Sequence, residues 1–166
     1  MPQAVFHVLS ALILADLIRD YIFKKRNFPL YLVLIAGIAG LLPDVDILIY
    51  WIFDLFSSPD FLLFHRTFTH SLLFVLLFLI PAFVLYNNQK WRKILLMVSF
   101  GVALHLLLDA VFVGTIMPFY PFSSYELGLN LLAGHFSGTL IQGIDAILLI
   151  LWLVYIEWRH RISDFI

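Results

Sequence analysis

The chain has 166 residues, of which 63% are hydrophobic and only 13% charged, and its mean hydropathy is +1.00. A soluble domain of this length has too little interior to bury so many apolar side chains, whereas helices in a bilayer can expose them to lipid. The net charge of -1 gives no support to a nucleic-acid partner. The absence of cysteine excludes disulfides, thiolate metal ligands and cysteine nucleophiles. We therefore expect a single integral membrane domain, residues 1–166, in the lipid bilayer.

The beginning of the chain lacks the positive leader of a secretory signal, and its apolar part contains His7 and Asp16, so we expect it to be retained as a helix. Apolar stretches of about 15 to 21 residues, where a straight span needs about 20, predict five membrane-embedded helices. They lie at residues 3–22, 28–42, 71–87, 93–113 and 139–157.

One further apolar stretch, residues 46–56, follows the Leu42-Pro43 break and is rich in aromatic residues but interrupted by Asp54. This composition favours an interfacial or re-entrant helix over another crossing. The expected fold is therefore all-α: a polytopic transmembrane bundle of about five membrane-embedded helices plus one interfacial or re-entrant helix.

The positions of the basic residues predict the orientation of this bundle. Nine of the ten Lys and Arg residues fall on one side of the five-span arrangement, and only Arg66 falls on the other. The positive-inside rule makes the basic side cytoplasmic, so we expect the N-terminus outside and the C-terminus inside an inner membrane. The same arrangement places the histidines and aspartates considered below on the outer side.

The motif "HLLLD" places His105 and Asp109 four residues apart, so the two side chains share one helix face and suit one metal or two neighbouring metals. Polar side chains inside a span are costly and usually face a partner or a water-filled cavity. The alternative is a hydrogen bond between these two residues alone.

"LLPDVDI" places Asp44 and Asp46 two residues apart after a proline. In extended backbone both carboxylates point the same way. At a helix start, one would cap the helix and the other would bind a cation. Capping alone is the competing interpretation.

"FHRTFTHSLL" contains His65 and His70, whose spacing would splay them by about 140° on a helix of 3.6 residues per turn. We therefore expect Thr67 or Thr69 to cap the third helix, with His70 in its first turn and His65 in the preceding loop. Arg66 would hold a phosphate or carboxylate, or else meet lipid headgroups.

Together these motifs predict a site for one or two divalent metal ions, zinc before manganese or magnesium. Because the candidates outnumber the ligands of one catalytic zinc, two metals with a bridging water are the economical explanation. The candidate ligands are His7, Asp44, Asp46, His65, His70, His105 and Asp109.

Other polar residues have weaker signals. Asp16 and Asp145 lie within spans, where a polar contact between helices is favoured over the alternative that they support the site. His135 and Glu126 belong to the long outer loop and would add a ligand or be solvated. His160 is expected to be a juxtamembrane base on the inner side. The segment 114–126, with two prolines and several aromatics, favours a structured rim or lid over a catalytic element, and an apolar entrance for lipid is a further interpretation.

The ordered set of "FH" near the start, "LLPDVD", "FHRTFTHSLL", "HLLLD" and "MPFYPF" resembles the YdjM-like family of membrane-bound metal-dependent hydrolases, over about residues 7–122. That family is thought to be distantly related to the zinc-dependent phospholipase C and single-strand nuclease superfamily.

The resemblance implies that His105 and Asp109 are the H-x-x-x-D ligands and His7 the early histidine. An aspartate of the Asp44 and Asp46 pair matches the bridging carboxylate, and the histidine after it is His65 or His70. The phospholipase relatives also bind metal through their free N-terminal residue and a later H-x-x-x-E pair. Neither is matched here, so the resemblance favours one or two metals over three.

The function expected from these features is hydrolysis of a phosphoester, in a phospholipid or another lipid-linked phosphate, at the outer leaflet. A divalent metal would activate water, Asp46 would act as a base and Arg66 would hold the phosphate. The alternatives are a non-catalytic metal-binding or metal-transporting membrane protein and a scaffold with a structural metal. The sequence leaves the oligomeric state open.

Overall fold

The computed structural model describes residues 4–23, 28–57, 67–112, 114–131 and 138–159, and the elements in these ranges are helical apart from one isolated bridge between Ile116 and Leu127. The prediction of an all-α fold is therefore confirmed. The longer helices are α1 (Ala4–Leu17), α2 (Leu30–Ala39), α3 (Val45–Ser57), α5 (Leu72–Val84), α6 (Gln89–Phe112) and α7 (Gly138–Arg159). The π-helical turn η1 (Ile18–Ile22) extends α1, and the 3-10 turn η2 (Phe68–His70) precedes α5.

The expected five spans are confirmed only in part. By length and composition, α6 is the one helix in the described ranges that is suited to cross a bilayer, and half of its most apolar window is buried in the bundle. Helix α2 has 10 residues and ends at Ala39, so the apolar residues Leu41 and Leu42 lie outside it. Helix α5 has 13 residues and ends at Val84. Hydropathy alone does not distinguish an apolar turn from an apolar helix, so the stretches 28–42 and 71–87 overestimated these two helices.

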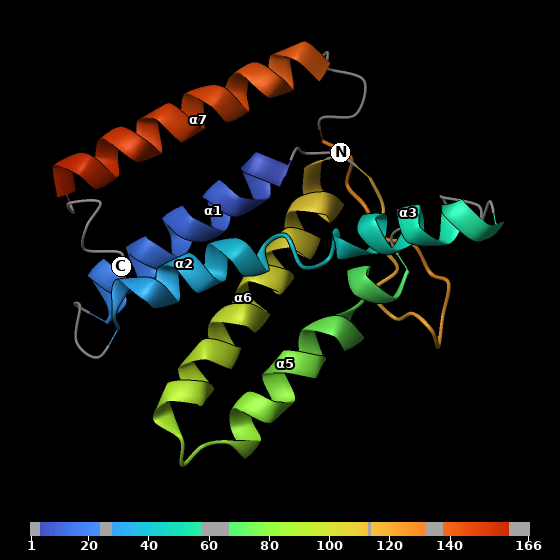
Figure 1. The fold of residues 1–166 in the computed structure, drawn as a ribbon, viewed down its shortest axis with the longest axis horizontal. Helices are drawn as coiled ribbons and strands as arrows, with labels where there is room; N and C mark the ends of the chain where they lie inside the picture. Colours follow the sequence, from blue (N-terminus) through green and yellow to red (C-terminus); the bar gives the residue numbers. More distant parts are fainter. Residues whose placement is uncertain (1–3, 24–27, 58–66, 113, 132–137, 160–166) are drawn as a thin grey trace.

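Helix α6 is the centre of the bundle and packs against α2, α5 and α1 (Figure 1). Helices α5 and α6 form an antiparallel hairpin (Figure 1), while α1 and α2 pack together against α6, where Met97 and Phe100 join their apolar core. Gly101 allows a close approach of α6 to α2: a Cβ there would overlap the Ala36 carbonyl oxygen and stand 2.8 Å from the Ala39 Cβ. The absence of a side chain at Gly101 therefore brings the backbone of α6 against the last turn of α2, one turn before His105.

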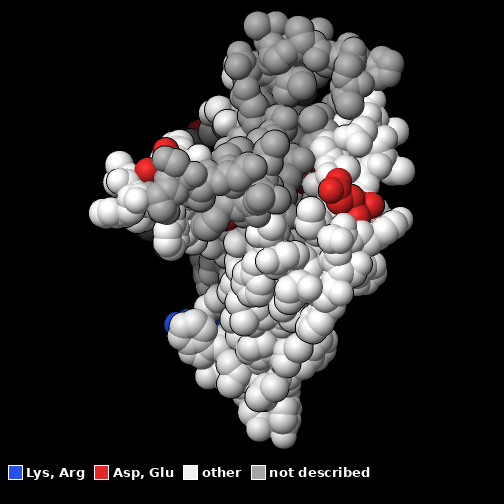
Figure 2. Space-filling model, turned by 90° about the vertical axis from the view of Figure 1, so that its right-hand side faces the viewer, with Lys and Arg blue, Asp and Glu red and all other residues white. Residues whose placement is uncertain are grey.

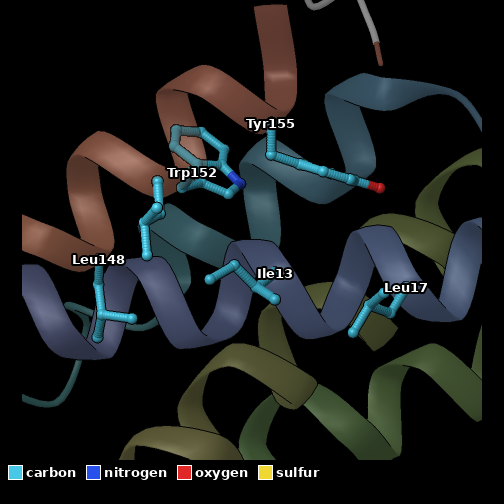
Figure 3. Close-up of a pocket in the computed structure, with 6 residues that line it drawn as sticks. Ile13, Leu17, Leu148, Trp152 and Tyr155 are labelled. Atoms are coloured by element: carbon cyan, nitrogen blue, oxygen red, sulfur yellow. The ribbon is translucent and has the colours of Figure 1, made fainter. Parts of the chain in front are cut away.

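Helix α7 packs against α1 on the side away from α5 (Figure 1). Between them lies an apolar cavity of 340 Å³, into which Ile13 and Leu17 of α1 face Leu148 and Trp152 of α7 (Figure 3). The described lining is apolar apart from the polar atoms of Trp152 and Tyr155, so this cavity offers no candidate metal ligand there.

Helix α3 projects from the bundle (Figure 1) and exposes large apolar side chains, with Leu55 and Phe56 more than three quarters exposed. Seen from this side, the described surface is largely uncharged, with acidic groups in its upper half and basic groups at a lower edge (Figure 2). Apolar side chains displayed in this way suit the boundary between headgroups and acyl chains, which is the environment predicted for residues 46–56.

Candidate metal centre

The structure brings together six of the seven residues predicted to bind metal, from four separate segments: His7, Asp44, Asp46, His70, His105 and Asp109. The seventh, His65, lies outside the described residues, as does Arg66. His7 lies in the first turn of α1, and Asp44 and Asp46 lie where the link after α2 enters α3. His70 belongs to the turn η2, and His105 and Asp109 to the second half of α6. Side chains distant in sequence therefore converge at one end of α6.

Two histidine nitrogens lie at the centre of the cluster. His70 Nε2 and His105 Nε2 are 3.3 Å apart. Asp44 Oδ1 lies 3.7 Å from the first and 3.5 Å from the second. Asp109 Oδ2 lies 3.6 Å and 3.7 Å from the same two atoms. Two imidazoles and two carboxylates thus direct four potential ligand atoms at one small volume.

The other ring nitrogen of each histidine is held by an acceptor. His105 Nδ1 donates to the Gly40 carbonyl oxygen at 2.7 Å, because that oxygen can only accept. On the other histidine, His70 Nδ1 lies 3.1 Å from Thr69 Oγ1 and 3.4 Å from Asp46 Oδ2, and Thr69 Oγ1 itself donates to Asp46 Oδ2 at 2.8 Å. With a proton on each Nδ1, both neutral rings present the lone pair of Nε2 to the shared volume.

His7 approaches Asp109 from the opposite side. Its Nε2 lies 3.3 Å from Asp109 Oδ1, while Asp109 Oδ2 faces His70 and His105. The His7 ring stacks on the His105 ring, with centroids 3.9 Å apart. His7 Nδ1 is buried and forms no hydrogen bond within the described part of the chain. His7 therefore fixes one oxygen of Asp109 and leaves the other for the central group.

Charge interactions shift the pKa values of the two residues that lie between helices. Burial alone favours the neutral acid of Asp44, but hydrogen bonding to His70 and the nearby histidines lower the pKa of Asp44 below its ordinary value. Burial also disfavours a charged His70, yet the carboxylates of Asp44 and Asp46 outweigh it and raise the pKa of His70. The site thus carries negative potential that attracts a proton or a metal cation to His70.

The geometry fits a small divalent cation. Zinc bonds of about 2.0–2.2 Å to nitrogen and oxygen separate neighbouring tetrahedral ligands by about 3.3–3.6 Å, close to the spacings around His70 and His105. Two overlapping trios offer ligand atoms within 4.8 Å of one another. They are His7, His105 and Asp109, and Asp44, His70 and His105. Both trios include His105, whose Nδ1 is engaged by the Gly40 carbonyl oxygen, so the remaining nitrogen of His105 serves only one ion.

Access to the cluster is uneven. The side chains of His7, His70, His105 and Asp109 are at most 2% exposed, but that of Asp44 is 23% exposed. Water or a ligand can therefore reach the space between His70 and His105 from the side where Asp44 lies.

The loop after α6 lies close to the turn that carries His70. Leu72 N, just after that turn, donates to the Pro118 carbonyl oxygen at 2.9 Å. The same loop exposes Phe119 and Phe122, in keeping with the predicted apolar rim.

The predicted cap of the third helix was wrong. Ser71, not Thr67 or Thr69, precedes α5, and its hydroxyl donates to the Phe68 carbonyl oxygen instead of capping the helix. His70 accordingly lies in the separate turn η2, where Thr69 bonds to Asp46 across the bundle. The tertiary partner of Thr69 outweighed its local capping preference.

The remaining polar residues lie apart from the centre or outside the described part. Asp16 lies near Arg19, which bonds Asp20 at 2.8 Å and donates to the Phe28 carbonyl oxygen at 3.0 Å, so these groups connect η1 to the start of α2. Glu126 accepts a hydrogen bond from Thr115 on the loop surface. The predictions on His135, His160 and the side chain of Asp145 fall on residues outside the description.

Two contributors escaped the sequence-based prediction of the site. Thr69 holds Asp46 and His70, and the Gly40 carbonyl orients His105. The signal for Thr69 was present, since it adjoins a candidate ligand in a polar motif. A main-chain carbonyl leaves no signal in residue identity, so Gly40 required the fold.

Comparison with protein-family models gave a match to the YdjM inner membrane protein family over residues 1–162. Comparison with curated proteins and with solved structures returned no match. The matched region includes every helix described above and all six clustered residues. The resemblance first suggested by the polar motifs thus extends over nearly the whole sequence, and the chain belongs to the YdjM inner membrane protein family.

Proposed function

We propose that this protein is a membrane-bound, metal-dependent hydrolase that cleaves a phosphoester. The observation that carries the proposal is the approach of His70 Nε2 and His105 Nε2 to 3.3 Å, with two carboxylates beside them. When both rings carry their proton on Nδ1, each Nε2 presents a lone pair to the other. Two such lone pairs repel unless a cation or a proton lies between them. A divalent cation satisfies both histidines and both carboxylates at once.

In this proposal Asp44, His70, His105 and Asp109 hold the ion, and His7 either fixes Asp109 or binds a second ion through the same carboxylate. Zinc suits this mixture of nitrogen and oxygen donors best, with manganese or magnesium as alternatives. The bound ion would supply Lewis acidity and lower the pKa of a water molecule bound to it toward neutrality.

We assign Asp46 the role of positioning His70, on the basis of its contacts. Its Oδ2 is engaged by the Thr69 hydroxyl and lies on the Nδ1 side of His70, whereas Asp44 lies on the Nε2 side. A carboxylate at that position keeps the proton on Nδ1 and raises the basicity of the ligating nitrogen. The alternative roles of Asp46, as a ligand or a base, are predictions that a metal-bound structure would test.

The substrate we propose is a phospholipid or another lipid-linked phosphate. Helix α3 begins one residue after Asp44, and the loop 114–131 bonds to the segment after η2 through Pro118 and Leu72. Both expose aromatic residues that would border an acyl chain. By its sequence position between two candidate ligands, Arg66 is proposed to hold the phosphate, and His65 to add a ligand. The site is proposed to face the outer leaflet, because the basic residues mark the other side as cytoplasmic.

Metal content measured on purified full-length protein tests the first step. Wild-type protein should retain about one or two ions per chain, while His105→Ala and His70→Ala should each lose most of them. His160→Ala, which changes the same residue type outside the predicted site, is the matched control. Equal metal content in all four proteins would contradict the assigned ligands.

Hydrolysis of phosphoester substrates tests the second step. In zinc- or manganese-supplemented detergent solution, wild-type protein should exceed a His70→Ala, His105→Ala double variant by several orders of magnitude, because removal of metal-activated water removes most catalysis. The enzyme assignment fails if wild-type protein with bound metal is no more active than the double variant. If chelation of the metal also unfolds the wild type, the metal is structural.

A further inference from the structure

A second cavity lies at the opposite end of α6 from the cluster of histidines and aspartates, between the end of η1, the start of α2 and the start of α6. It has a volume of 450 Å³ and its walls include Phe23, Phe28, Arg92, Lys93, Leu96 and Met97. Thirteen residues of α6, about 20 Å at 1.5 Å per residue, separate Arg92 from His105. This cavity is therefore distinct from the proposed hydrolase site.

One wall of the cavity is positively charged. Arg92 and Lys93 are partly buried in the first turn of α6, and no ion pair joins the Arg92 guanidinium to a carboxylate among the described residues. Asn88 caps this helix end, with its side-chain oxygen accepting from Trp91 N at 3.3 Å. The cationic side chains, not free helix amides, are thus the groups that would meet an anion.

The other walls are apolar. Phe23 and Phe28 stack with ring centroids 5.3 Å apart, Phe28 is buried in the core, and Phe23 is 48% exposed at the cavity edge. Leu96 lies one turn further along α6 than Arg92, and Met97 one turn further than Lys93. A ligand that fills this space must combine an anionic end with an apolar chain.

We propose that this cavity binds one anionic phospholipid, with its phosphate on Arg92 and Lys93 and the first part of an acyl chain against Phe23, Leu96 and Met97. Charge complementarity and the apolar walls both favour this occupant over a soluble anion, which would gain nothing from the walls. A zwitterionic lipid would place its own cation next to Arg92 and Lys93. The binding site is independent of the metal cluster and of the proposed hydrolysis.

Native mass spectrometry of the full-length protein in detergent tests the proposal, with phosphatidylglycerol and phosphatidylcholine of identical acyl chains as probes. Wild-type protein should retain phosphatidylglycerol at least about fivefold more tightly, as expected for a cation near an anionic headgroup. Arg92→Gln should lose that preference, and Arg92→Lys should keep it. Lys90→Gln removes the same charge from an exposed position outside the cavity walls and should bind like wild type.

Three results would overturn the proposal. They are equal retention of both lipids, equal effects of Arg92→Gln and Lys90→Gln, and displacement of phosphatidylglycerol by millimolar glycerol 3-phosphate, which would identify a soluble ligand. Circular dichroism checks that Arg92→Gln keeps its helix content. If it does not, Lys93→Gln supplies the second removal of one cation, with the same loss expected. Metal content should be unaffected throughout, which separates this test from that of the hydrolase site.

Discussion

His70 and His105, 35 residues apart in the sequence, face each other through their Nε2 atoms at 3.3 Å. Their Nδ1 atoms are each engaged on the far side, by Gly40 in one case and by Thr69 and Asp46 in the other. Both rings are therefore oriented by groups that would not touch the ion. The predictions below address these orienting groups, because a purely structural cluster would not respond in the same way.

Asp46→Asn should shift the pH dependence of metal binding. A proton on His70 Nε2 competes with the metal, and the negative charge of Asp46 helps to raise the pKa of His70 above 6.5. Wild-type affinity should therefore begin to fall at a higher pH than the affinity of the variant. Metal titrations between pH 8 and pH 5 measure the two midpoints.

The matched control for this experiment is Asp54→Asn, which removes the same charge from an exposed position on α3. Its midpoint should equal that of wild type, and an equal midpoint for Asp46→Asn would refute the assigned coupling. For the metal-free protein the sign of the stability effect follows from the same shift. Because the pKa of His70 is raised, its stabilising contribution is complete below about 6.5 and is lost as the pH rises through the raised value.

Thr69→Val should weaken metal binding about 10–100-fold, the usual cost of removing a group that orients a ligating histidine. Valine keeps the shape of threonine but leaves Asp46 Oδ2 without the hydroxyl that donates at 2.8 Å. Thr69→Ser restores the hydroxyl and should recover most of the affinity. Isothermal titration of the metal-free proteins measures this, and failure of serine to rescue would point to lost packing instead.

Gly101→Ala should weaken the site from a distance. Its Cβ would overlap the Ala36 carbonyl oxygen, so α6 must move away from α2 at a cost of about 1–3 kcal/mol for overpacking. The same movement lengthens the bond from His105 to Gly40 and lowers metal affinity. Thermal unfolding and metal titration measure both effects.

Leu107→Ala serves as the control for Gly101→Ala, since Leu107 lies on the same helix and is 57% exposed. It should change neither metal affinity nor the helix separation. Full metal affinity in Gly101→Ala would show that the approach of α6 to α2 does not position His105.

Reporter fusions test the proposed orientation. A reporter after Ile166 should be cytoplasmic and one inserted near Ser58 should be outside. In the five-span arrangement, nine of the ten basic residues lie on the same side of the membrane as the C-terminus, and the positive-inside rule makes that side cytoplasmic. Alkaline phosphatase and a fluorescent protein, each fused at both positions, report the two compartments. The opposite pattern would place the metal cluster at the inner face and exclude an outer-leaflet substrate.

The sequence by itself determined the helical class and the approximate positions of the helices, because apolar stretches bounded by Pro, Gly and charged residues form helices in either a bilayer or a bundle core. It also determined that His105 and Asp109 share a face, since their four-residue spacing is a property of the helix alone. Neither result depends on how the helices pack.

Only the tertiary structure decided which nitrogen of His70 each aspartate of the cluster faces. Asp44 and Asp46 are indistinguishable as sequence, yet one faces Nε2 of His70 and the other faces Nδ1, because α3 begins between them and turns Asp46 toward Thr69. The lengths of α2 and α5 likewise depended on where apolar residues enter turns. Local sequence specifies which groups are available, but ligand direction is set by contacts between segments that are far apart along the chain.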